Sequence, residues 1–169
     1  PFVNGKWTFM HNGQIAGFDA IRRRMEAALS DRLYRARHGT TDSELLFLLA
    51  IEFGLETDPA AAFSEAIRFA LAEAARANVR ELVRFTAAFS DGETLYAIRY
   101  ANDEYAPTLY SAPTCGNKGH CLVSEPFKDS DTKWHEIPAG SFVTLTAGGI
   151  SSARFSPMQV DVVKVAEVA

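Results

Sequence analysis

The feature that most constrains the fold is a change of hydrophobic periodicity near residue 80. From Phe18 to about Asn78 the apolar residues fall at helical spacings, whereas from Leu82 onward short runs of β-branched and aromatic residues are separated by turn residues. Helices are therefore followed by strands and do not alternate with them. This order predicts an α+β fold with an antiparallel sheet, and it argues against a doubly wound nucleotide-binding fold.

Three helices are predicted before this change: from about Phe18 to Ser30, from Thr41 to Gly54, and from Asp58 to about Asn78. Thr41 and Glu44 have the spacing of a capping box, which predicts Thr41 as an N-cap. Pro59 follows Asp58 at the first position of the third helix, where proline is favoured.

Strand signals dominate the rest of the chain. Leu82–Phe89 and Thr94–Tyr100 flank Asp91-Gly92, which predicts an antiparallel hairpin with a two-residue turn. Further strand candidates are "TLYSA", "CLVSE", "SFVTLTA" and "MQVDVVKV".

Composition bounds the class of protein. The 169 residues, 47% of them hydrophobic, suit one globular domain spanning residues 1–169. The formal charge of -4 gives no basic face for nucleic acid, and no apolar run reaches the roughly 20 residues of a membrane span, so neither partner is expected. Cys115 and Cys121 flank His120, but the other histidines are scattered, so we expect reduced cysteines in a cytoplasmic protein, no metal and no cofactor.

The tripeptide "HNG" at His11-Asn12-Gly13 has two interpretations. It follows a predicted strand at Lys6–Met10, and Asn-Gly is a common turn dipeptide that would end this strand. Alternatively, the Asn12 side-chain amide and the Gly13 N–H converge on one oxygen, as the donors of an oxyanion hole do in acyl transfer.

The segment "TTDSE" also has two interpretations. Thr41 and Glu44 alone would cap a helix. Asp42 is not needed for capping, and at the first helical position the helix dipole favours its ionised carboxylate, which suits it to hold an ammonium group.

Taken in order, the two motifs and those downstream resemble the class II glutamine amidotransferases, which are N-terminal-nucleophile hydrolases. The further segments are "PFVNGKWTFMHNG", "SDGETLYAIRY", "PTLY", "CLVSEPF" and "WHEIPAGSFVTL", and they look like the YafJ-like stand-alone subgroup. The resemblance implies a four-layer αββα sandwich and hydrolysis of glutamine or of a γ-glutamyl compound. It matches Asn12 and Gly13 to the oxyanion hole, Asp42 to the site of the substrate α-amino group, and His11 to structural support, the role that the capping box gives Thr41 and Glu44.

The family's nucleophile is a cysteine at the mature N-terminus, whose own α-amino group acts as the base. This chain starts at Pro1, so the resemblance implies the larger, C-terminal part of the domain, a sandwich incomplete at its N-terminus and inactive by itself. Cys115 and Cys121 cannot replace the nucleophile, because no terminal amine lies beside them. A homo-oligomer or a partner synthase or peptidase subunit fits the same family.

Two other functions remain open at this point. A degenerate relative would bind a γ-glutamyl compound or an amino acid through Asp42 without catalysis. A purely structural α+β domain would use the same capping box and the same Asp91-Gly92 turn.

Overall fold

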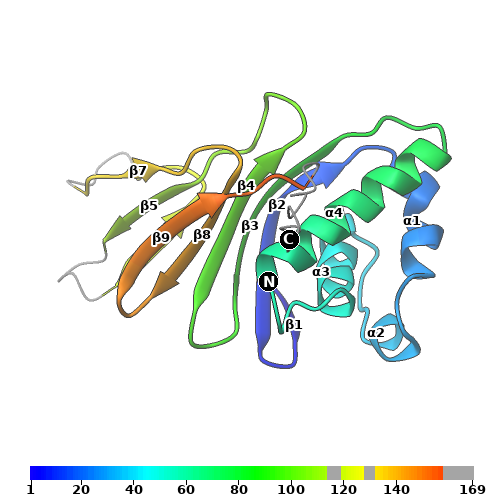
Figure 1. Ribbon diagram of the computed structural model, residues 1–169, viewed down its shortest axis with the longest axis horizontal. Helices are drawn as coiled ribbons and strands as arrows, with labels where there is room; N and C mark the ends of the chain where they lie inside the picture. The colour runs from blue at the N-terminus through cyan, green and yellow to red at the C-terminus, as the bar shows by residue number, and fades with distance from the viewer. Residues whose placement is uncertain (114–118, 128–131, 158–169) are drawn as a thin grey trace, which may run out of the picture.

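The helices of this protein cover one face of a large antiparallel sheet, and a smaller sheet lies beyond its other face (Figure 1). The computed structural model describes residues 1–113, 119–127 and 132–157. The predicted strand "MQVDVVKV" and Cys115 lie outside these residues. The α+β class is confirmed.

The helices precede most of the strands, as predicted. The helices are α1 (Phe18–Glu26), α2 (Asp31–Arg35), α3 (Asp42–Glu52) and α4 (Pro59–Arg76). The strands are β1 (Phe2–Asn4), β2 (Trp7–Ile15), β3 (Val83–Ser90), β4 (Leu95–Ala101), β5 (Tyr110–Pro113), β6 (His120–Val123), β7 (His135–Glu136), β8 (Ser141–Thr146) and β9 (Gly149–Arg154).

The predicted helix starts are confirmed by their caps. Thr41 accepts a hydrogen bond from the Glu44 amide at the start of α3, and Asp58 accepts one from the Ala61 amide at the start of α4. Gly54 follows α3 with a φ of 98°, which ends the helix. The short helix α2 was not predicted, because its five residues are too few to show a periodicity.

Six strands form the large sheet in the order β1-β2-β3-β4-β8-β9, and the small sheet has the order β6-β5-β7. Strands β3 and β4 form the predicted antiparallel hairpin. The prediction of a two-residue turn was wrong, because Ser90 pairs with Leu95 and the four residues between them connect the strands. Asp91 accepts hydrogen bonds from the Glu93 and Thr94 amides, and these bonds stabilise the longer loop.

The strand predicted at Lys6–Met10 corresponds to β2, which is longer than the sequence indicated. We expected Asn12-Gly13 to end it, but β2 continues to Ile15, and Asn12 and Gly13 pair with Thr86 and Phe85 of β3. The turn interpretation of this dipeptide was therefore wrong.

The main core lies between the helices and the large sheet. It includes Ile21 of α1 and Leu46 of α3, which confirms that these two predicted helices pack on the same sheet. A smaller apolar cluster lies on the side of the small sheet: Ala97, Leu109, Ile137, Val143 and Leu145. The two faces of the large sheet are thus buried to very different extents.

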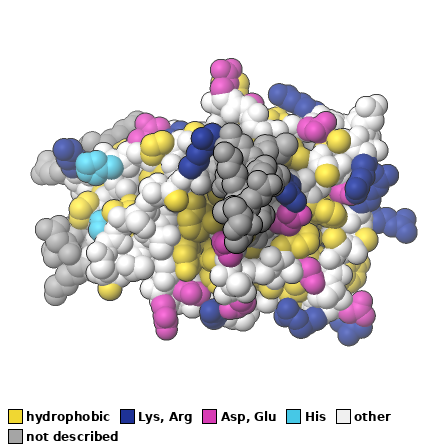
Figure 2. All heavy atoms as spheres, in the orientation of Figure 1, with side chains coloured by type: hydrophobic (Ala, Val, Ile, Leu, Met, Phe, Trp, Pro, Cys, Tyr) yellow, Lys and Arg dark blue, Asp and Glu magenta, His cyan; other side chains and the backbone are white. Residues whose placement is uncertain are grey.

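The charged side chains on the face drawn in Figure 2 are spread out. Lys and Arg are interspersed with Asp and Glu and form no continuous basic patch on that face. Among the described residues, none of the helices has both the length and the apolar composition of a membrane-spanning segment.

Candidate active site

Gly13 lies in the middle of β2 with a φ of 153°. A Cβ at this position would lie 1.9 Å from the Arg84 carbonyl oxygen and 2.7 Å from His11 Nε2. The carbonyl belongs to the backbone of β3 and cannot rotate away. Position 13 therefore requires glycine because two backbones approach closely there.

The Gly13 amide faces an edge of β2 that no other described strand covers. The Ala16 amide donates to the Leu82 carbonyl at 2.9 Å, so the even-numbered residues of β2 bond to β3 and the odd-numbered amides face the opposite edge. Strand β1 pairs with this edge only as far as Phe9. The Gly13 N–H is thus available to an oxygen atom of a ligand.

Asp42 lies at the same edge. Its Oδ2 accepts a hydrogen bond from the Ile15 amide at 2.8 Å, and its Oδ1 accepts one from the Ser43 amide at 2.7 Å. Ile15 is two residues beyond Gly13 on the same edge, about 7 Å along the strand. The fold therefore brings Asp42 of α3 to the edge of β2 two residues beyond Gly13.

Asn12 points to the face of β2 that looks toward the small sheet. Its side chain is exposed and has no hydrogen-bond partner among the described residues. It lines a cavity of about 230 Å³ with residues of β2, β3, β6 and the adjoining loops: Met10, His11, Thr86, Ala87, Ala88, Leu109, Leu122, Val123 and Ser124. A larger cavity of about 420 Å³, beside His120 and His135, does not include Asn12.

His11 points to the helical side and makes mainly structural contacts. Its ring lies 4.7 Å from the Phe85 ring, and its Nδ1 is 2.8 Å from Ser43 Oγ. Burial lowers the pKa of His11 below its ordinary value, although Asp42 and the Arg84 carbonyl act in the opposite direction. Nε2 is buried beside that carbonyl without a well-formed hydrogen bond. A neutral, packed imidazole is thus the main form at neutral pH.

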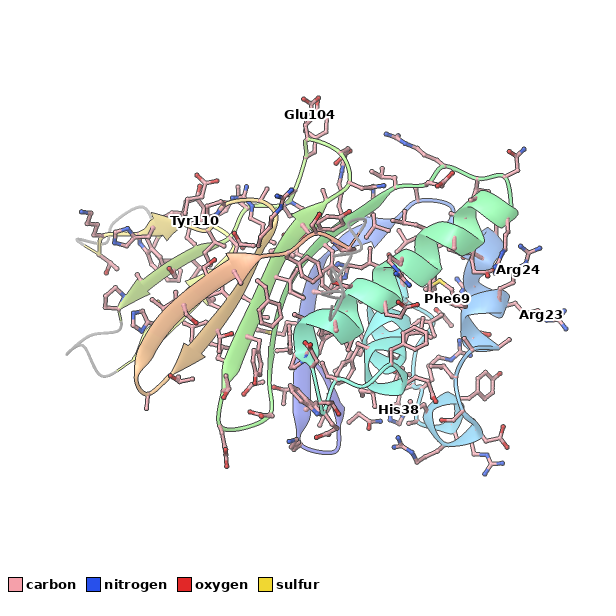
Figure 3. All side chains as sticks on the ribbon, viewed as in Figure 1. Arg23, Arg24, His38, Phe69, Glu104 and Tyr110 are labelled. Carbon is pink, nitrogen blue, oxygen red and sulfur yellow. The ribbon has the colours of Figure 1, made fainter. Side chains whose placement is uncertain are left out.

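Thr41 and Glu44 do only part of what a capping box predicts. Thr41 Oγ1 caps the Glu44 amide at 3.3 Å. The buried Glu44 carboxylate does not return to Thr41; its two oxygens accept hydrogen bonds from the His38 and Gly39 amides at 2.8 and 2.7 Å. Glu44 therefore fixes the loop that leads into Asp42. His38 in this loop is labelled in Figure 3, at the helical end of the molecule.

The thiol that the structure describes does not lie in a reactive setting. Cys121 on β6 is half-buried, and its Sγ contacts the Ala112 carbonyl at 3.5 Å. Within the described residues, no group of three or more His, Cys, Asp or Glu side chains is arranged to hold a metal ion.

Ser43 is a residue that the sequence analysis did not single out. It lies within the "TTDSE" motif, but its role depends on a contact with His11, 32 residues earlier in the chain, that no local pattern could show.

Comparison with solved structures places this chain in a family. A glutamine aminotransferase class-II domain protein from Silicibacter pomeroyi has a solved structure that matches with a TM-score of 0.88 and 42% identity, over 94% of this chain and 71% of that one. The chain belongs to the class II glutamine amidotransferase family. The family assignment confirms the N-terminal-nucleophile hydrolase type of fold.

More distant members share the fold. The glutamine phosphoribosylpyrophosphate amidotransferase of B. subtilis matches with a TM-score of 0.63 and 16% identity, over 95% of this chain and 31% of that one. A protein of Pseudomonas aeruginosa described as a predicted glutamine amidotransferase matches with a TM-score of 0.55 and 19% identity, over 85% and 59%. No protein-family model and no curated protein matches the chain.

Proposed function

We propose that this protein hydrolyses the side-chain amide of glutamine, or a γ-glutamyl bond, through a cysteine that lies upstream of Pro1. The observation that supports the proposal is that Asp42 accepts a hydrogen bond from β2 two residues beyond Gly13, at the edge to which the Gly13 amide points. Asn12 precedes Gly13 on the same strand, and its exposed side chain lies on the face of β2 toward the small sheet. The Gly13 amide, a donor for an oxyanion, and Asp42, an anion for an ammonium group, thus meet β2 at positions about 7 Å apart along the strand.

Each group has a defined task in this reaction. The α-amino group of the cysteine takes up the proton of the thiol, and the resulting thiolate adds to the amide carbonyl. Asn12 and Gly13 donate hydrogen bonds to the oxyanion that forms, after which ammonia leaves and water hydrolyses the thioester. Asp42 holds the substrate α-ammonium group in the ground state and in the transition state. The nucleophile must stay reduced, which suits a cytoplasmic location.

Asn12→Ala tests the oxyanion role in the full-length protein. Because the Asn12 amide is aimed at a charge that develops only in the transition state, kcat should fall by roughly 100-fold or more while KM changes little. Steady-state release of glutamate and ammonia from glutamine measures both constants. Gln14→Ala is the matched control, since Gln14 is exposed on the same face of the same strand.

Asp42→Asn tests the ammonium site. Its partner is present before the reaction begins, so KM for glutamine should rise first, with a smaller fall in kcat. Asp31→Asn is the control, because Asp31 occupies the same first position in α2 and is exposed. Unchanged kcat and KM in Asp42→Asn would show that Asp42 has only a structural role, at the start of α3 and in its hydrogen bond to Ile15. Binding of glutamine without turnover by the wild-type protein would support a binding module instead.

A further inference from the structure

The first turn of α3 is bonded to β2 on both sides of Asn12-Gly13. Before the dipeptide, His11 Nδ1 lies 2.8 Å from Ser43 Oγ. After it, the Ile15 amide donates to Asp42 Oδ2 at 2.8 Å. Asp42 and Ser43 are consecutive residues, so one helix start holds both flanks of the predicted oxyanion donors.

The two attachments are joined to each other. Ser43 Oγ lies 3.3 Å from Asp42 Oδ1, and the Ser43 amide donates to the same oxygen. A continuous chain of polar contacts therefore runs from the Asp42 carboxylate through the Ser43 hydroxyl to the His11 ring. This chain connects the group that would hold the substrate ammonium with the residue next to Asn12.

The His11 ring has little freedom apart from this contact. It lies 4.7 Å from the Phe85 ring and 6.2 Å from the Phe9 ring, centroid to centroid. Its Nε2 lies over Gly13, at 2.7 Å from the position of an added Cβ, and lacks a well-formed hydrogen bond. The hydroxyl of Ser43 is thus the hydrogen-bond partner that fixes the rotation of a ring packed directly against Gly13.

We propose that Ser43 is a positioning residue, which holds the Asn12 and Gly13 donors in their catalytic orientation by way of His11. This inference rests on the proposed function for its effect on rate, but the contact it describes does not depend on that function. Burial favours the neutral form of His11, whose Nδ1 either donates a hydrogen bond to the Ser43 hydroxyl or accepts one from it, depending on the tautomer.

Ser43→Ala in the full-length protein removes the hydroxyl and leaves both backbone contacts of Asp42 in place. We expect kcat for glutamine to fall about 3- to 10-fold, the effect of losing one hydrogen bond of ordinary strength, and KM to change less than about twofold. Ser43→Thr, which keeps the hydroxyl, should restore most of the kcat. Ser30→Ala is the control, since Ser30 caps α2 without a side-chain hydrogen bond and should leave both constants unchanged.

A second measurement separates this inference from the proposed function. In amide NMR spectra, Ser43→Ala should shift the Asn12 and Gly13 signals, Ser43→Thr should return them toward their wild-type positions, and Ser30→Ala should not move them. Unchanged Asn12 and Gly13 signals in Ser43→Ala would overturn the inference, whether or not glutamine is hydrolysed. In an active enzyme, an unchanged kcat, or a rise in KM with kcat intact, would overturn it as well. Absence of glutamine hydrolysis in the wild-type protein would instead count against the proposed function, and the NMR shifts would then decide the inference alone.

Discussion

At the scale of single residues, Gly13 is the position with the least tolerance for change. A φ of 153° and a backbone oxygen 1.9 Å from the site of a Cβ combine there. Gly13→Ala should lower the free energy of unfolding by roughly 3 kcal/mol or more, because the steric clash adds to the strain of a backbone conformation that glycine alone adopts readily. Urea unfolding of the full-length protein measures this loss.

Gly5→Ala is the comparison for a positive φ without a steric clash. Gly5 has a φ of 58°, but no atom lies within 4 Å of an added Cβ. The free energy of unfolding of this variant should fall by only about 1–2 kcal/mol. Equal losses in the two variants would contradict the close approach of β2 and β3 at Gly13.

At the scale of helices and strands, the sequence predicted those elements whose signals are local. The starts of α3 and α4 were predicted because Thr41 and Asp58 cap them through neighbouring amides. The continuation of β2 through Asn12 was missed, because it depends on pairing with β3, which lies more than 70 residues later in the chain. The candidate site shows the same division: its residue types could be read from the motifs, whereas the hydrogen bond that joins Asp42 to β2 beside Gly13 could not.

Glu44 of α3 holds the loop that precedes this helix. Its two carboxylate oxygens accept the His38 and Gly39 amides, so Glu44→Gln replaces one acceptor by an NH₂ group that faces an N–H donor. The free energy of unfolding should fall by about 1–3 kcal/mol, and the His38 and Gly39 amides should exchange hydrogen faster. Hydrogen exchange followed by NMR, together with urea unfolding, measures both effects.

Glu65→Gln provides the comparison for Glu44→Gln. Glu65 lies on the exposed side of α4 and forms an ion pair with Arg68. Glu65→Gln should lower the free energy of unfolding by less than about 0.5 kcal/mol and leave hydrogen exchange at the His38 amide unchanged. If Glu44→Gln behaved like Glu65→Gln, the loop before Asp42 would have to be held by other contacts.

Across the molecule as a whole, Arg99 supplies several of the contacts that the described residues make between the large sheet and the region of the small sheet. Arg99 lies on β4 and is buried on the side of the small sheet. Its guanidinium donates to the Pro107 carbonyl at 3.0 Å, to Glu136 Oε1 at 2.7 Å and to the Ile137 carbonyl. Among the described residues the apolar cluster on this side has five buried members, so we expect these polar bonds to contribute to holding the small sheet.

Arg99→Met should therefore loosen the small sheet more than the large one. It leaves buried carbonyl groups unpaired, which should cost about 2–4 kcal/mol of unfolding free energy. In native-state hydrogen exchange, the Ile137 amide, which donates to the Leu109 carbonyl, should lose protection while the β2–β3 amides keep most of theirs. Arg35→Met removes an exposed ion pair with Asp31. It should change the free energy of exchange by no more than about 0.5 kcal/mol, both at the Ile137 amide and at the β2–β3 amides. Equal loss of protection in both sheets would contradict the weaker attachment of the small sheet, because the two sheets would then open as one cooperative unit.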